Sequence, residues 1–106
     1  MVATPLTTSN KTEAFEQLAL KYKALSDPKR LEILNKICLM HTACVCDLME
    51  ELDIPQSKLS YHLKILLTAG LLDKETKGTW SFYSINQQEM DHLISNQICN
   101  VITPSC

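Results

Sequence analysis

Apolar residues recur at helical spacing through the first two thirds of the chain and predict four helices. The first is expected from Thr12, which can cap a helix, to Leu25. The second follows the clearest start signal, with Ser26 or Asp27 at the N-cap and Pro28 at the first helical position. The third is expected at about 43–52 and the fourth at 56–68, after a turn at Pro55. The apolar positions that share helix faces are Phe15, Leu18, Ala19 and Tyr22, then Leu31, Leu34, Ile37 and Cys38, and then Leu59, Leu63 and Leu66.

The pattern changes to alternation after Gly70. The runs "LLDKET" and "TWSFYSI" flank Lys77-Gly78, which predicts a β-hairpin with its tip there. Asn86, with Glu89 three residues later, then signals a last helix. The apolar stripe of that helix comprises Met90, Leu93, Ile94, Ile98, Val101 and Ile102.

A short helix, a turn, a second helix and a hairpin form the middle of this order. That order predicts a helix-turn-helix with a wing, in a mainly α fold with a β-hairpin (α+β), and the second helix of the pair would lie in the major groove of DNA. The predicted boundaries are a flexible arm at 1–11, one winged-helix domain at 12–102 and a tail at 103–106.

Length and charge qualify this prediction. A chain of 106 residues, 45% hydrophobic and 21% charged, is expected to form one small domain. The net charge of −2 argues mildly against nucleic acid, but residues 54–85 carry four lysines against two acids. The polar N-terminus and the lack of any apolar run near 20 residues predict neither secretion nor membrane spanning, so we expect a cytoplasmic protein.

Hydrogen-bonding side chains occupy the fourth helix opposite its leucines. An ordinary solvated face would look similar, but the hairpin that follows favours DNA recognition, with lysines placed to touch phosphates. We expect His62 to pack beside the leucines or to bridge to the DNA backbone, and Lys29 and Arg30 to be solvated. The predicted DNA-binding residues are Gln56, Ser57, Ser60, Tyr61, His62, Lys64, Lys74 and Lys77.

Five cysteines are many for such a chain, and in a reducing compartment they suggest metal or redox chemistry. Cys44 and Cys46 lie two apart, so in a regular helix they would point about 200° apart and could not face one partner. Binding one ion between them therefore requires an unwound first turn or a geometry already outside the helix. Cys38 fits core packing, Cys99 lies near the last apolar stripe, and Cys106 is a tail thiol.

The runs "ALSDPKRLEIL", "CVCDLMEEL" and "PQSKLSYHLKILLTAGLLDKETKGTWSFYSI" resemble the ArsR/SmtB family of winged-helix metal-sensing repressors over residues 15–98. The resemblance implies a homodimer through the first and last helices that binds double-stranded operator DNA and leaves it when a metal or metalloid binds. The apolar stripe on the last helix agrees independently with a dimer.

The resemblance also places the effector site at Cys44 and Cys46, which match the family's CVC element. Arsenite-sensing members usually carry a third cysteine where this chain has Met49, and a thioether is a poorer arsenic ligand than a thiolate. The third ligand would then be Cys99, Cys106 or Cys38, with a weak preference for a C-terminal thiol. The implied effector is arsenite or antimonite, or alternatively cadmium or lead, with no organic cofactor.

Two alternatives compete with this function. A thiol redox or persulfide-sensing repressor of the same fold would pair a cysteine in the second helix with one in the last, where Cys38 and Cys99 fall, although their spacing differs from the expected one. An enzyme is disfavoured, because the sequence has no Gly-rich phosphate loop and no plausible triad. The family's zinc-type histidine site on the last helix is also missing, since only Asp91-His92 is present there.

Overall fold

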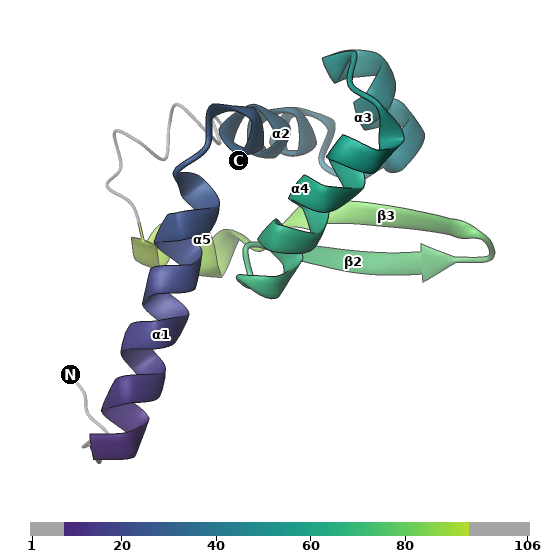
Figure 1. The fold of residues 1–106 in the computed structure, drawn as a ribbon. Coiled ribbons are helices and arrows are strands. Elements are labelled where there is room, and N and C mark those ends of the chain that lie inside the picture. The colour runs from purple at the N-terminus through teal and green to yellow at the C-terminus, as the bar shows by residue number, and fades with distance from the viewer. Residues whose placement is uncertain (1–7, 94–106) are drawn as a thin grey trace.

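The computed structural model describes the backbone of residues 8–93 and the side chains of residues 12–91. A long first helix projects from the body at one side, and a hairpin projects at another (Figure 1). The elements are α1 (Thr8–Leu25), α2 (Pro28–Met40), β1 (Ala43–Cys44), α3 (Val45–Leu52), α4 (Gln56–Thr68), β2 (Leu72–Lys77), β3 (Trp80–Ile85) and α5 (Gln87–Leu93). The predicted winged helix-turn-helix order is therefore confirmed.

The start of α2 illustrates how local sequence sets these elements. Of the two predicted N-caps, Asp27 takes the position, and its carboxylate accepts hydrogen bonds from the backbone N–H groups of Lys29 (2.8 Å) and Arg30 (3.2 Å). Pro28 begins the helix, where its missing N–H costs nothing. By contrast, α1 begins at Thr8 rather than at the predicted Thr12.

The sheet has three strands in the order β1-β3-β2, and each neighbouring pair is antiparallel. The hairpin of β2 and β3 was predicted, although its turn falls at Gly78-Thr79, one residue later than expected. The strand β1 was not predicted. Its two residues pair with β3, so that Ala43 lies opposite Tyr83 and Cys44 opposite Phe82. The helix predicted from about residue 43 consequently begins at Val45.

The core lies between α2, α3, α4 and the inner face of the hairpin. The three inward leucines predicted on α4 are all buried, as are Leu34, Ile37 and Cys38 on α2. Met90 of α5 is fully buried in the same core. The other residues of the predicted last stripe lie where side chains are not described.

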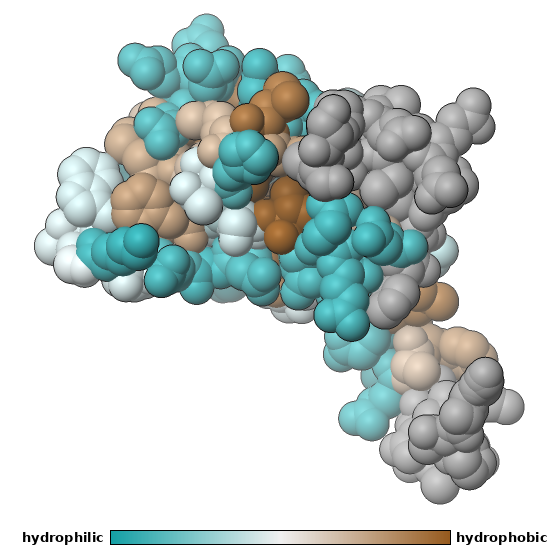
Figure 2. Space-filling model, turned by 180° about the vertical axis from the view of Figure 1, so that it is seen from behind, coloured by the Kyte–Doolittle hydropathy of each residue, from teal (hydrophilic) through white to brown (hydrophobic). Residues whose placement is uncertain are grey.

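The apolar side of α1 is largely uncovered within one chain. Phe15, Leu18 and Tyr22, spaced to share a helix face, are exposed at 64%, 43% and 51%. In Figure 2 apolar side chains interrupt the hydrophilic surface along the projecting end of α1, at lower right. In residues 8–93 no helix is both long enough and apolar enough to cross a bilayer.

Candidate nucleic-acid interface and thiol site

The helices α3 and α4 form the helix-turn-helix pair. Asp53, in the left-handed region at φ 52°, ends α3, and Pro55 precedes the first residue of α4. The leucines of α4 face inward, which leaves its opposite side free. The predicted base-reading residues on that side are all exposed; they are Gln56, Ser57, Ser60, Tyr61 and Lys64.

The hairpin carries the two lysines predicted to touch phosphates. Each ammonium group lies 5.9 Å from an aromatic ring centre on β3, Lys74 over Tyr83 and Lys77 over Phe82. Lys77 also lies 4.0 Å from the carboxylate of Glu75, but both side chains are well exposed. The rings therefore support the lysine side chains while the charges stay accessible to solvent.

Arg30 was predicted to be solvated, and that prediction is wrong. Its residue is only 9% exposed, and its Nε donates to the backbone carbonyl of Ala24 at 2.8 Å. Its Nη1 lies 3.1 Å from Nδ1 of His62, a half-buried residue of α4. Because a guanidinium can only donate, Nδ1 must accept and His62 is neutral in this contact. Arg30 thus ties α2 to α4, the predicted reader helix, while DNA contact by His62 stays a prediction.

The surroundings of His62 disfavour its protonated form. Burial lowers its pKa, and the charges of Arg30 and Lys58 add to this, while Asp27 opposes it. The pKa of Asp27 is also lowered: partial burial raises it, but hydrogen bonds from the backbone N–H groups of Arg30 and Lys29 outweigh that effect.

These shifts predict a loss of stability in mild acid. The unfolded state binds the His62 proton at higher pH than the folded state does, so the free energy of unfolding should fall as pH drops below about 6.5. His62→Gln keeps an acceptor without a titrating ring and should flatten this dependence in urea unfolding at pH 7.5 and pH 5.5. His41→Gln, the same substitution at an exposed histidine, is the matched control and should keep the parent's slope.

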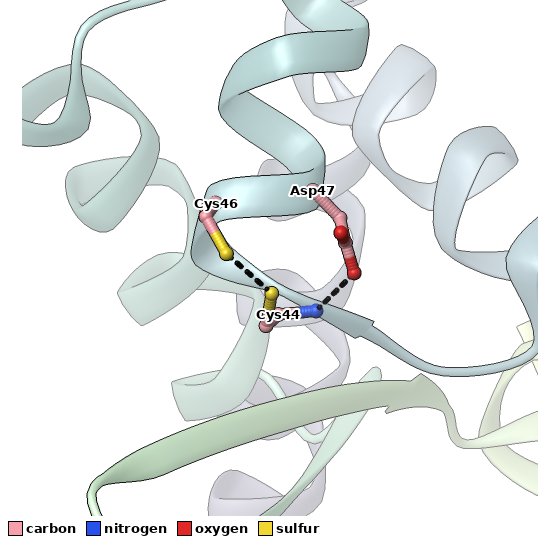
Figure 3. Close-up of side chains that lie close together, drawn as sticks. All are labelled: Cys44, Cys46 and Asp47. Atoms are coloured by element: carbon pink, nitrogen blue, oxygen red, sulfur yellow. Dashed lines mark hydrogen bonds between the residues drawn. The ribbon is translucent and has the colours of Figure 1, made fainter.

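The two cysteines of the CVC element meet at the start of α3. Cys44 ends β1 and is the N-cap of α3 in extended conformation (φ −89°, ψ 169°), whereas Cys46 lies in the first turn. Their sulfurs point toward one another at 2.8 Å (Figure 3). The geometry lies outside the regular helix from the outset, which is the second of the two possibilities that the sequence left open.

Their environments differ. Cys44 is 6% exposed and Cys46 is exposed, and both are free thiols. The carboxylate of Asp47 accepts a hydrogen bond from the backbone N–H of Cys44 at 3.3 Å, and the three potential ligand atoms lie within 4.8 Å of one another. Burial raises the pKa of the Cys44 thiol, and the contact with Cys46 raises it further. Binding of a soft ion to this thiol would therefore release a proton.

A pocket of about 290 Å³ adjoins the two thiols. Its walls come from three elements: Val45 and Met49 of α3, Gln56 at the start of α4, and the wing residues Thr79, Trp80 and Ser81. The sequence did not point to Trp80 or Ser81 as neighbours of the thiols, because the pairing of β1 with β3 brings them there. The thiol pair thus lies between the reader helix and the wing.

The predicted third ligand is not found next to the pair. Among the described residues, Cys38 lies buried in α2 and is held in a disulfide. Cys99 and Cys106 lie outside the described residues, so neither is placed relative to the site. The described cluster offers two sulfurs and one carboxylate.

Known proteins share this sequence and architecture. The family model described as bacterial regulatory protein, arsR family, matches residues 27–74. The arsenical resistance operon repressor of Bacillus subtilis is 53% identical over 89 residues, which cover 84% of this chain and 85% of that protein. A homolog of the cadmium resistance transcriptional regulatory protein CadC from Staphylococcus aureus is 29% identical, with 73% of this chain and 64% of that protein covered.

A solved structure shows the same fold. The homodimeric winged helix-turn-helix DNA-binding domain of a possible ArsR-family regulator from Mycobacterium bovis superposes with a TM-score of 0.73. The match covers 85% of this chain and 82% of that domain at 23% identity.

Proposed function

Because the chain belongs to the ArsR family of bacterial regulatory proteins and is a transcriptional repressor, we propose that it binds operator DNA as a homodimer and leaves it when arsenite or another thiophilic ion binds Cys44 and Cys46. One observation carries this proposal: the two free sulfurs converge at 2.8 Å at the start of the helix that supports the reader helix. As a DNA-binding regulator the protein is not an enzyme, and it would act in the cytoplasm, where its operator lies.

The face of α4 opposite the leucines would read base edges in the major groove. Ser57, Ser60, Tyr61 and Lys64 recur at three- and four-residue spacing, so they share one exposed stripe. Hydroxyl and ammonium groups on such a stripe can hydrogen-bond base edges. The wing would lie along the phosphate backbone, which fixes position without reading sequence.

Lys74→Ala and Lys77→Ala should weaken DNA binding across sequences. Removing one phosphate contact should reduce the slope of log affinity against log salt by about 1, because fewer counterions are released on binding. Fluorescence anisotropy of labelled duplexes between about 50 and 200 mM salt would measure this. An unchanged slope in both variants would place the wing away from the backbone. Lys36→Ala, which removes a lysine of α2 that pairs with Glu51 of α3 at 3.6 Å, is the control.

A second copy of the chain would cover the apolar side of α1. Phe15, Leu18 and Tyr22 are exposed together on the projecting helix, which is unfavourable for a small monomer in water. A symmetric dimer through this face would set two reader helices about one helical turn of DNA apart. Sedimentation of the reduced protein should give a dimer at micromolar concentration.

The position of the thiol pocket suggests how an effector could release DNA. An ion held by Cys44 and Cys46 would lie beside a pocket that Gln56 of α4 and the wing strand also line, so its binding would affect both elements. Two sulfurs at about 2.3 Å from one tetrahedral ion lie roughly 3.8 Å apart, so binding must widen the observed 2.8 Å separation. The ion would therefore bind more tightly to a conformation in which α4 and the wing are arranged differently. This difference in affinity between two conformations is what would couple the ion site to the DNA-binding surface.

Arsenite or antimonite is the proposed effector, with cadmium or lead as alternatives, and no organic cofactor is proposed. Thiolates suit all four ions, and the names of the two relatives indicate both arsenic and cadmium responses in those proteins.

Operator release by the reduced dimer is the direct test. Labelled operator, bound at physiological salt, should dissociate on addition of arsenite and rebind when a dithiol competitor removes it. Retention of the operator at every concentration of the four ions would disprove ion-triggered release.

The disulfide at Cys38 favours one other function, a thiol redox repressor of the same fold. Peroxide, rather than arsenite, would then release the operator, and Cys38→Ser would remove that response. Arsenite release that survives in Cys38→Ser would favour the ion sensor.

A further inference from the structure

The thiol site has two cysteine sulfurs, and Met49 lines the pocket beside them. Trivalent arsenic forms three bonds, and the described residues place two thiols and the thioether Met49 at this site. We propose that this site takes monosubstituted trivalent arsenicals, R–As(OH)2, which bring their own carbon substituent as the third group on arsenic. This inference rests on the proposed function and specifies its ligand.

Two thiols are sufficient for this ligand class. The sulfurs of Cys44 and Cys46 each displace one hydroxyl from arsenic, two As–S bonds replace two As–O bonds, and the two thiol protons leave in two waters. Arsenic remains trivalent and the product is neutral, so no oxidant or reductant is needed. The sulfurs already lie 2.8 Å apart and point at one another (Figure 3), so a single arsenic atom can bridge them with a small outward movement.

The pocket beside the sulfurs supplies a place for the carbon substituent. Val45, Met49 and Trp80 give it an apolar side next to both cysteines, and Gln56, Thr79 and Ser81 line the rest. Its volume of about 290 Å³ lies just below the usual range for small-molecule sites, which suits a group as small as methyl or phenyl. Trp80 is 56% exposed, and a substituent packed against its indole would remove apolar surface from water.

The same surroundings suit the other candidate ions less well. Arsenite on two thiols would keep a hydroxyl instead of a carbon substituent on arsenic, so it would gain no apolar contact with Val45, Met49 or Trp80. A tetrahedral divalent ion needs four ligands, and the described cluster offers three, one of which is the Asp47 carboxylate that already accepts a backbone hydrogen bond.

Competition between arsenicals on the reduced full-length protein tests the proposal. Native mass spectrometry would record the fraction of protomers carrying phenylarsonous acid, methylarsonous acid or arsenite, each added alone and in pairs. We expect one adduct per protomer, formed with loss of two waters, and half-saturation by phenylarsonous acid at a concentration about tenfold or more below that of arsenite. Cys44→Ser should lose all three adducts.

Two variants separate the pocket from the thiols. Trp80→Ala should weaken the binding of phenylarsonous acid and leave the binding of methylarsonous acid nearly unchanged, because the larger phenyl group makes the indole contact. Met49→Cys supplies a third thiol and should raise the affinity for arsenite by about tenfold or more, which would remove the preference for phenylarsonous acid over arsenite. Leu39→Cys, exposed on α2, adds a thiol elsewhere and should leave the preference as it is.

The outcomes distinguish this inference from the proposed function. If arsenite binds as tightly as phenylarsonous acid and Cys99→Ser or Cys106→Ser weakens it, the third ligand is a protein thiol and the inference fails while the ion sensor stands. If Trp80→Ala and Met49→Cys leave every affinity unchanged, the pocket takes no substituent. If no arsenical binds the reduced parent, both proposals fail.

Discussion

Replacing either Cys44 or Cys46 by serine should abolish operator release by arsenite and leave operator binding intact. Serine is nearly isosteric with cysteine, but its hydroxyl stays protonated near pH 7 and does not bind soft ions. The loss of one of two sulfurs 2.8 Å apart should raise the arsenite concentration for half-release beyond the 10- to ~100-fold typical of outer-shell changes at metal sites.

Anisotropy of labelled operator, titrated with arsenite, would measure this effect. Ser81→Ala alters the same pocket without touching a thiol and serves as the matched control. If both serine variants release the operator at the parent's arsenite concentration, the effector binds elsewhere and the CVC element is only a helix start.

The double variant Ser60→Ala, Tyr61→Ala should lose specific operator binding. Both side chains are exposed on the reader face, and Tyr61 is 62% exposed with its ring edge against His62 at 5.3 Å between centres. Removing one base contact should cost about 1–3 kcal/mol of binding free energy, which raises the dissociation constant for the operator. Binding to non-specific DNA should be less affected.

Gln88→Ala on α5, remote from the reader face, is the control for that experiment. The unfolding midpoints of both variants should match the parent's, since no buried group is removed. Unchanged operator affinity in a folded double variant would remove α4 from the base-reading interface.

Local periodicity was sufficient to predict most of the fold. The helices α2 and α4 and the hairpin follow from start signals and apolar spacing within a few residues, and so does the exposed face of α4. The start of α1 was missed because residues 8–11 carry no apolar period, and helix ends are the least certain part of such a prediction.

Features that depend on tertiary contacts could not be predicted in this way. A two-residue strand has no pattern, so β1 and the extended backbone of Cys44 emerged only from pairing with β3. Arg30 in the first turn of α2 has the spacing of a solvated residue, yet the carbonyl of Ala24 and the ring of His62 bury it. The exposed tryptophan beside the thiols depends on the same long-range pairing as β1.

The pairing of Cys44 with Phe82 has a consequence for folding. These residues are 38 positions apart (82 − 44), and the segment between them contains α3, α4 and β2. Closing so long a loop costs conformational entropy, which the packing of the enclosed helices and strand must offset. We therefore expect the backbone that positions the Cys44 sulfur to form after the elements it encloses. A chain whose α4 and wing have not docked would have no preorganised thiol pair. Under the proposed function, ion capture by the assembled site would therefore be confined to molecules that are already folded to bind DNA.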